Sequence, residues 1–208
     1  MTDAALSQSD SSARGARSGR PWVLIVVLLV CGFFGEWAAG ALTIDKITTA
    51  ADPSAALDCN FSVLVQCGKN LGSWQGAAFG FPNPILGVAC WAAPIVVAMA
   101  LIAGARFANW FWWLFNVGHA FALGFCIWLM SQSVFDLGTL CPWCMLTWAV
   151  SILSFWVLTG HNLREGRFGA WGVGLGRFLM GWWPLVTLVS YLIIALIAQL
   201  RLDYLSML

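Results

Sequence analysis

Four of the seven cysteines in the chain form two close pairs, and paired thiols can do redox chemistry. Cys141 and Cys144 enclose a Cys-Pro-Trp-Cys motif, and Cys59 and Cys67 lie eight residues apart. A disulfide inside Cys-x-x-Cys closes a very small loop and stabilises a fold little, so the motif favours reversible thiol–disulfide exchange. A c-type haem site is excluded, because Met145 rather than His follows the second cysteine.

Two other interpretations of the cysteines stay open at this point. Both pairs could be structural disulfides, or the four thiols could bind zinc, although the spacing of Cys59 and Cys67 is wider than zinc ligands usually show. The position of the Cys-x-x-Cys motif favours the redox interpretation. It begins an apolar stretch, with Pro142 in the first turn, and the positive end of a helix dipole lowers the pKa of a thiol there.

The composition indicates an integral membrane protein. Of the 208 residues, 61% are hydrophobic and only 9% are charged, whereas a soluble domain carries about 25% charged residues. So few charges exclude a soluble globular enzyme and a disordered chain. A net charge of +1 excludes the basic surface that nucleic-acid binding needs. The lipid bilayer is therefore an expected partner and nucleic acid is not.

Five stretches reach the roughly 20 apolar residues that a membrane-spanning helix needs. They cover about residues 22–42, 84–105, 110–130, 140–159 and 182–200. If the chain crosses five times, seven of the ten Lys and Arg residues fall on one side. These are Arg14, Arg17, Arg20, Arg106, Arg164, Arg167 and Arg177. Because basic residues accumulate in cytoplasmic segments, we expect a cytoplasmic N-terminus and both cysteine pairs on the extracytoplasmic side.

The segments outside the spans differ in character. Residues 1–20 are expected to be a disordered cytoplasmic tail, and residues 21–204 form the expected transmembrane domain. Short turns are expected at 106–109 and 131–139, and a Gly-rich, basic inner connection at 160–181.

The outer loop, 43–83, is too long and too apolar for a plain linker. We expect it to form a short helix or lid on the membrane surface. The apolar residues expected to pin it are Leu64, Leu71, Trp74 and Phe79.

Both cysteine pairs are expected on the oxidising side of the membrane, where disulfides form and persist. Two dithiol pairs at one membrane face indicate a relay, in which one pair exchanges with an external protein and the other with a carrier in the lipid. Oxidation of a dithiol releases two electrons and two protons, and a quinone is the lipid-soluble carrier that takes both. A membrane quinone is therefore the simplest acceptor.

These motifs resemble those of the bacterial homologues of vitamin K epoxide reductase. The resemblance covers about residues 22–200 and rests on the two cysteine pairs, on Ser73-Trp74 after the loop pair and on Asn83 at the head of the second span. It implies an all-α integral membrane fold: a four-helix transmembrane bundle around a quinone, a fifth transmembrane helix, and an extracytoplasmic half-helix lid. It also implies quinone-dependent thiol oxidation that supports disulfide formation, with menaquinone or ubiquinone as the acceptor.

The resemblance also implies roles for individual residues. Cys144 would lie next to the quinone ring, and Cys141 would exchange with the loop. Cys67 would form the transient bridge to Cys141, and Cys59 would receive electrons from the external partner. The resting bridge could be either Cys59–Cys67 or Cys67–Cys141. The residues expected to contact the quinone are Asn83, Trp148, Ser73 and Leu71.

The chain departs from the family pattern in two respects. Trp148 stands where the animal enzymes have a Tyr that donates to the quinone, and an indole N–H can also donate one hydrogen bond. Many bacterial relatives carry a fused thioredoxin-like domain, whereas this chain stops at Leu208. The expected partner is therefore a separate DsbA-like thioredoxin-fold protein, secreted or membrane-anchored, and the expected location is the bacterial cell (inner) membrane.

Several residues also have simpler interpretations. Asn83 precedes Pro84 and could be only a helix N-cap, and Trp148 could be core packing. Glu36 and His119 are ionisable residues inside expected spans. We expect Glu36 to be a hydrogen-bonded residue near the membrane boundary and His119 to be a packed polar residue. The remaining cysteines are expected to pack as small hydrophobic residues, and they are Cys31, Cys90 and Cys126.

Other functions stay open on the sequence alone. A convergent DsbB-type thiol oxidase would have the same activity. A non-catalytic membrane protein would hold the same cysteines as structural disulfides. A reductase acting on a quinone or its epoxide for its own sake would use the same chemistry with different reactants supplied.

Overall fold

Five long helices dominate the computed structural model, which describes residues 20–203. They are α2 (Trp22–Ala51), α4 (Asn83–Ile102), α5 (Asn109–Ser131), α6 (Pro142–Arg164) and α7 (Val173–Leu202). Each lies in a segment long and apolar enough to cross a membrane. The prediction of an all-α, multi-pass membrane protein is confirmed. The predicted tail lies outside the described residues, apart from Arg20.

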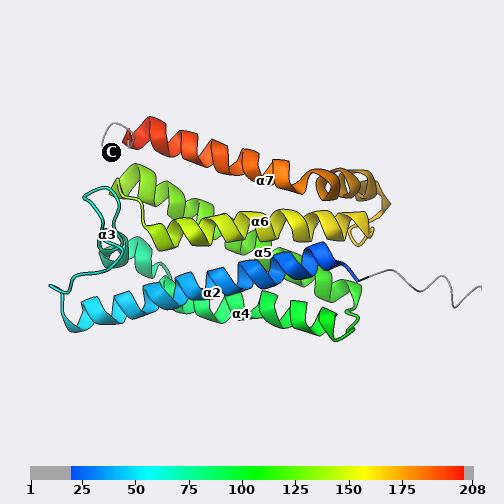
Figure 1. Cartoon of the computed structure of the whole chain (residues 1–208), viewed down its shortest axis with the longest axis horizontal. Helices are drawn as coiled ribbons and strands as arrows, with labels where there is room; N and C mark the ends of the chain where they lie inside the picture. The colour runs from blue at the N-terminus through cyan, green and yellow to red at the C-terminus, as the bar shows by residue number, and fades with distance from the viewer. Residues whose placement is uncertain (1–19, 204–208) are drawn as a thin grey trace, which may run out of the picture.

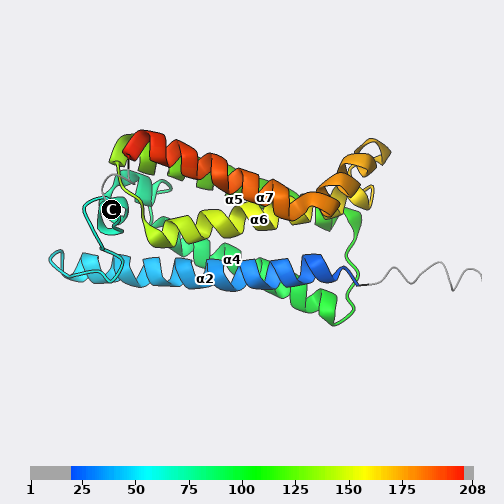
Figure 2. The same ribbon diagram turned by 45° about the horizontal axis from the view of Figure 1, so that its top comes forward.

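The helices run along the long axis of the molecule, and the chain reverses direction between them (Figure 1). α2 packs against α4 and α6, and α6 packs also against α5. These four helices form the predicted bundle, and α7 lies against α6 on its outside (Figure 2). Two hydrogen bonds fasten α7. The Trp156 indole donates to Oγ of Ser190 at 3.1 Å, and the Tyr191 hydroxyl donates to the carbonyl of Ala149 at 2.7 Å.

The centre of the bundle is closely packed. Fully buried apolar side chains from α2 and α6 meet there, namely Leu24, Ile25, Leu28, Val157 and Leu158. Since lipid tails are as apolar as these side chains, close packing rather than exclusion of water holds membrane helices together. Cys31 and Cys126 are buried as predicted, whereas Cys90 is exposed on α4, so the prediction is wrong for Cys90.

Helical structure extends further than the sequence predicts. α2 continues past residue 42 to Ala51, and a π-helix, η2 (Gln132–Leu137), occupies most of the expected 131–139 turn before Gly138 ends it at φ 63°. The expected inner connection, 160–181, is shortened to residues 165–172, which include η3 (Ala170–Gly172). Hydropathy marks where hydrocarbon contact ends, whereas backbone hydrogen bonds can continue a helix into the interface.

Gly35 marks the close approach of α2 to α4. A Cβ atom there would lie 2.2 Å from Cδ2 of Trp91, whereas a Cβ at Gly40 of the same helix would have nothing within 4 Å. We expect Gly35→Ala to destabilise the bundle by about 1–3 kcal/mol, as overpacking does. Gly40→Ala is the matched control and should be neutral or stabilising, since Ala favours helix. Circular dichroism during thermal unfolding in detergent measures both, and equal melting temperatures would contradict the tight packing.

Candidate functional site

The outer loop folds over one end of the bundle and contains the predicted half-helix. It forms α3 (Gly68–Gly72) and a 3-10 turn, η1 (Trp74–Ala77). Backbone hydrogen bonds join this loop to the strand-like segment before α6, because Gln66 N–H donates to the carbonyl of Leu140 at 3.0 Å and Leu140 N–H donates to that of Leu64 at 2.8 Å. This pairing brings the loop cysteines to the start of α6.

Two lysines hold the lid at its edges. Nζ of Lys46, on the outer extension of α2, donates to the carbonyl of Leu71 at 2.7 Å. Nζ of Lys69, within α3, donates to the carbonyl of Leu137 in η2. Of the predicted apolar pins, Leu71 is buried, whereas Trp74 is largely exposed. Polar contacts that the sequence did not reveal therefore anchor the lid beside the apolar ones.

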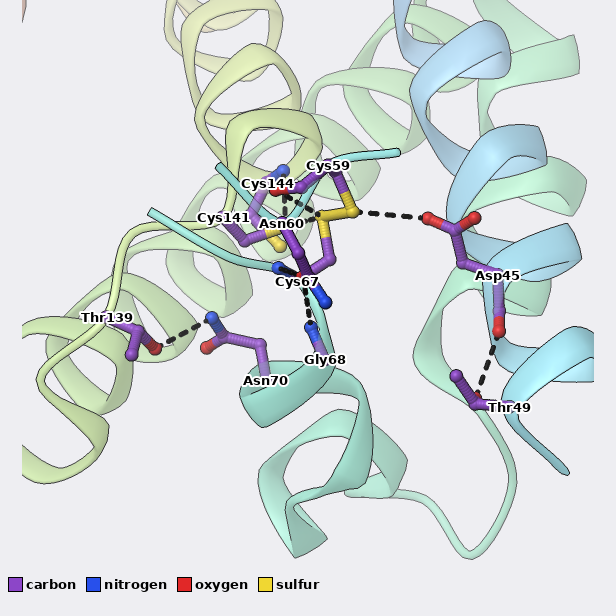
Figure 3. The surroundings of a disulfide bond; sticks show 10 residues. All are labelled: Asp45, Thr49, Cys59, Asn60, Cys67, Gly68, Asn70, Thr139, Cys141 and Cys144. Carbon is purple, nitrogen blue, oxygen red and sulfur yellow. Dashed lines mark hydrogen bonds between the residues drawn. A yellow bond between two sulfur atoms is a disulfide. The ribbon is translucent and has the colours of Figure 1, made fainter. Parts of the chain in front are cut away.

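The four candidate redox cysteines lie close together, and we call this group the sulfur row (Figure 3). Cys59 and Cys67 form a disulfide with an S–S distance of 2.05 Å, while Cys141 and Cys144 are free thiols. Sγ of Cys141 lies 3.4 Å from Sγ of Cys67, and both residues are fully buried. Of the two bridges that the sequence left open, the structure has Cys59–Cys67, with Cys141 within reach of exchange.

Cys141 occupies the N-cap position of α6. Its sulfur accepts a hydrogen bond from the backbone N–H of Cys144 at 3.4 Å, and Pro142 lies in the first turn, as predicted. The hydrogen bond from the Cys144 side chain lowers the pKa of the Cys141 thiol most. Backbone N–H groups of Cys144 and Trp143 lower this pKa further, and desolvation opposes them. The thiolate form, which is the nucleophile, is thereby favoured at Cys141.

We expect Cys144→Ala to raise the pKa of Cys141, because the variant lacks the strongest of these hydrogen bonds. The Cys141 thiolate should then form at higher pH in the variant than in the wild type. The pKa of Cys141 is measured from the ultraviolet absorbance of its thiolate as a function of pH. The spectra of the same protein with Cys141→Ser are subtracted to remove the contribution of the other thiols. Cys144→Ser keeps a hydroxyl donor and should restore most of the lowered pKa. An unchanged titration in Cys144→Ala would show that this hydrogen bond does not control Cys141.

A cavity of about 560 Å³ lies beneath the lid, between α4 and α5. These two helices are not closely packed pairwise, which leaves the space. Its wall includes Cys144 and all four residues predicted to contact a quinone, namely Asn83, Trp148, Ser73 and Leu71. Cys59, Cys67 and Cys141 lie outside the wall. The structure thus divides the predicted site residues into a sulfur row and a cavity, which meet at Cys144.

The side chain of Asn83 joins the lid to α4. Its Nδ2 donates to the carbonyl of Gln75 at 2.6 Å, and its Oδ1 accepts from the N–H of Ala78 at 3.0 Å. Pro82 is the N-cap residue and Asn83 caps no helix, so the simple N-cap interpretation is wrong. An amide Nδ2 carries two N–H groups, and one of them remains for a ligand in the cavity.

The other three cavity residues differ in what they offer. Trp148 lies one turn after Cys144 on the same side of α6 and is only 7% exposed. The Ser73 hydroxyl is engaged within the lid, because its Oγ donates to the carbonyl of Asn70 at 2.7 Å and accepts from the N–H of Gly76 at 3.3 Å. Leu71 adds an apolar wall. Of the three, Trp148 is the one whose aromatic side chain can pack against a flat ring.

Sequence reasoning missed Gln75 and Asp136. Gln75 is buried, and its Nε2 donates to Oδ2 of Asp136 in η2 at 2.6 Å. Through its carbonyl it also accepts from Asn83, so a hydrogen-bond chain links the end of α5, the lid and α4 above the cavity. The only sequence feature that could have indicated Gln75 is that it is the single amide side chain within the otherwise apolar stretch 74–82.

The two ionisable residues within spans differ from each other. His119 lines the cavity, and its Nδ1 donates to the carbonyl of Phe115 at 3.0 Å, while the two rings pack together. Glu36 does not line the cavity. Its Oε2 has no hydrogen-bond partner among the described residues, so the expectation of a hydrogen-bonded boundary residue is wrong.

One group of side chains has the spacing of a metal site. Ligand-type atoms of Asp45, Cys59 and Cys67 lie within 4.8 Å of one another. The two sulfurs are bonded to each other in this oxidised form, so the thiolates that zinc requires are not present. The geometry therefore supports sulfur exchange at this place.

Residues 26–159 match the sequence profile of the vitamin K epoxide reductase family. The matched segment covers more than half of the chain and contains the sulfur row, the lid and nearly all of the four bundle helices, while α7 lies beyond it. No curated protein is similar enough in sequence for a residue-by-residue comparison. With a sulfur row that reaches a cavity inside a membrane bundle at Cys144, the chain belongs to the vitamin K epoxide reductase family of membrane thiol oxidoreductases.

Proposed function

We propose that the protein passes electrons from an extracytoplasmic DsbA-like thioredoxin-fold protein to a membrane quinone, and so supports disulfide bond formation. One observation carries the proposal. A row of sulfur atoms leads from the Cys59–Cys67 disulfide through Cys141 to Cys144 at the cavity wall. A loop at one end suits a water-soluble donor, and a cavity among membrane helices at the other end suits a lipid-soluble acceptor.

The order of the sulfurs defines the steps. A thiolate of the reduced partner attacks Cys59, and Cys67 leaves as a thiolate. The second thiol of the partner then releases the partner as a disulfide, which leaves Cys59 and Cys67 reduced. Cys67 attacks Cys141 of a Cys141–Cys144 disulfide, and Cys59 attacks Cys67, which restores the loop disulfide. The net result is an oxidised partner and a reduced Cys141/Cys144 pair.

The lining of the cavity supports a quinone as the acceptor. Aromatic side chains such as Phe111 and Phe121 extend its wall along α5, where an isoprenoid chain can lie. Asn83 supplies an N–H for a carbonyl oxygen of menaquinone or ubiquinone, and Trp148 supplies a ring face. A bound quinone accepts the two electrons and two protons that the Cys-x-x-Cys pair releases as it forms its disulfide.

The charge distribution supports an orientation with the lid outside the cytoplasm. The end of the bundle opposite the lid contains Arg106 and Arg167 in its connections and Arg164 as the last residue of α6. Basic residues favour the cytoplasmic side of a membrane. This distribution supports an orientation in which the sulfur row faces the extracytoplasmic space, and the bacterial inner membrane is the location that the proposed function implies.

An anaerobic assay tests the proposal. Purified protein in detergent receives a reduced thioredoxin-fold protein and menadione, and quinol formation is followed optically. We expect the wild type to form quinol and Cys144→Ala to form none. Cys31→Ala is the matched control, because Cys31 is a free cysteine outside both the motif and the cavity wall, and it should retain wild-type activity. Absence of quinol with the wild type would refute quinone coupling, and quinol formation that survives in Cys144→Ala would refute the relay through Cys144.

A further inference from the structure

Asp45 faces the loop disulfide from the side opposite Cys141 (Figure 3). It lies on the outer extension of α2, and its Oδ2 is 3.4 Å from Sγ of Cys59. A disulfide sulfur carries no proton, so the contact in this oxidised form is not a hydrogen bond. Once the disulfide is reduced, a Cys59 thiol at this place has a carboxylate oxygen to which it can donate.

Nothing else in the described part of the chain competes for the Asp45 carboxylate. The neighbouring Lys46 donates to the carbonyl of Leu71 instead. Between residues 20 and 203, Asp45 takes part in no ion pair, and its carboxylate has no further hydrogen-bond partner. Cys59 is only 3% exposed, so water has little access to its sulfur. The carboxylate is therefore the base in contact with Cys59.

We propose that Asp45 is the general base for Cys59 in the step that restores the loop disulfide, an assignment that rests on the proposed relay. Before this step Cys67 is bonded to Cys141 and Cys59 is a thiol. The S–H bond of Cys59 breaks, and its proton passes to the Asp45 carboxylate. The Cys59–Cys67 bond forms, and the Cys67–Cys141 bond breaks with its electron pair remaining on Cys141 as a thiolate.

The structure has the arrangement that follows this step. The loop disulfide is formed, the displaced sulfur of Cys141 is 3.4 Å from Cys67, and the Asp45 oxygen is 3.4 Å from Cys59. The new thiolate on Cys141 accepts the backbone N–H of Cys144. When the next partner leaves and Cys59 is released as a thiolate, Asp45 returns the proton. Over a full cycle Asp45 gains no net proton.

Trapping of intermediates tests this assignment. Fully reduced protein in detergent is mixed anaerobically with menadione and quenched with acid at intervals, and disulfide-linked peptides are quantified by mass spectrometry. We expect Asp45→Asn to form the Cys67–Cys141 bridge at the wild-type rate but to resolve it about 100-fold more slowly, the lower end of what a positioned base contributes. Asp45→Glu should restore most of the rate.

Two controls make the result specific. Asp58→Asn removes an exposed carboxylate that is next to Cys59 and acts on Asp45 only through its charge, so it should resolve the bridge within a few-fold of the wild-type rate. Cys59→Ala gives the fully trapped bridge as a reference. A misplaced lid would slow formation of the Cys67–Cys141 bridge, whereas loss of a base slows only its resolution. Equal resolution rates in Asp45→Asn and the wild type would overturn the assignment.

Diamide in place of menadione separates this inference from the proposed function. Diamide oxidises the Cys-x-x-Cys pair without a quinone. In one outcome, menadione produces no disulfide in the wild type while diamide still reveals slow resolution of the Cys67–Cys141 bridge in Asp45→Asn. That result would refute quinone coupling and support the role of Asp45. If both oxidants drive the relay and Asp45→Asn resolves the Cys67–Cys141 bridge as fast as the wild type, the role of Asp45 is refuted and the proposed function is supported.

Discussion

Replacing Cys67 with Ala should abolish quinone reduction driven by a thioredoxin-fold partner, with a loss on the order of 10³-fold or more, as for removal of an obligatory nucleophile. Cys67 is the loop residue whose sulfur reaches Cys141, at 3.4 Å. The same variant should still reduce menadione when dithiothreitol is the electron donor. The Cys67 sulfur lies against Cys141, so we expect its removal to make room for a small dithiol to reduce the Cys-x-x-Cys disulfide directly.

Paired donors make this prediction specific to the relay. Cys144→Ala should be inactive with either donor, because it lacks the thiol at the cavity wall. Initial rates of quinol formation with each donor, for Cys67→Ala and Cys144→Ala, measure the pattern. Partner-driven activity that persists in Cys67→Ala would show that electrons enter without the loop pair.

Replacing Asn83 with Ala should lower kcat for quinone reduction by about 10²–10³-fold, the effect of removing one preorganised donor to developing negative charge. The loss should fall on kcat more than on KM, because such a donor acts most strongly where charge develops. The change also leaves the carbonyl of Gln75 and the N–H of Ala78 without partners, which should destabilise the fold by about 1–3 kcal/mol. Steady-state kinetics with menadione and thermal unfolding measure the two effects.

Gln75→Ala distinguishes the two roles of Asn83. It removes the side-chain hydrogen bond to Asp136 but keeps the backbone carbonyl that Asn83 contacts. We expect it to lower stability and to leave kcat within a few-fold of the wild type. A kcat loss in Gln75→Ala as large as that in Asn83→Ala would mean that the position of the lid, and not the Asn83 amide, controls the reaction.

Much of the architecture could be predicted from the residues because its signals are local. Apolar runs of about 20 residues mark membrane helices, and all five expected spans correspond to helices. The helix ends were harder, since α2 continues to Ala51 beyond its apolar run. That extension matters for the site, because it brings Lys46 to the lid and Asp45 to the disulfide.

Side-chain partners in the site were less accessible to sequence reasoning. Asn83 followed by Pro84 reads as a helix N-cap, yet the Asn83 amide contacts the lid. Gln75 has no periodicity or motif to distinguish it, and its importance is visible only when η2 and α4 are seen to approach it. Cys90 was expected in the core but is exposed, since α4 does not pack closely against α5.

The sequence by itself determined the membrane class, the number of long helices and which cysteines form close pairs, because hydropathy and cysteine spacing act between near neighbours in the chain. The family resemblance implied that Cys67 meets Cys141, 74 positions later, and the tertiary structure places their sulfurs 3.4 Å apart. Only the tertiary structure decided that Asp45 meets Cys59, 14 positions later. Such contacts depend on how α2, the loop and the start of α6 converge at one end of the bundle. No local pattern encodes a distance between elements that packing alone brings together.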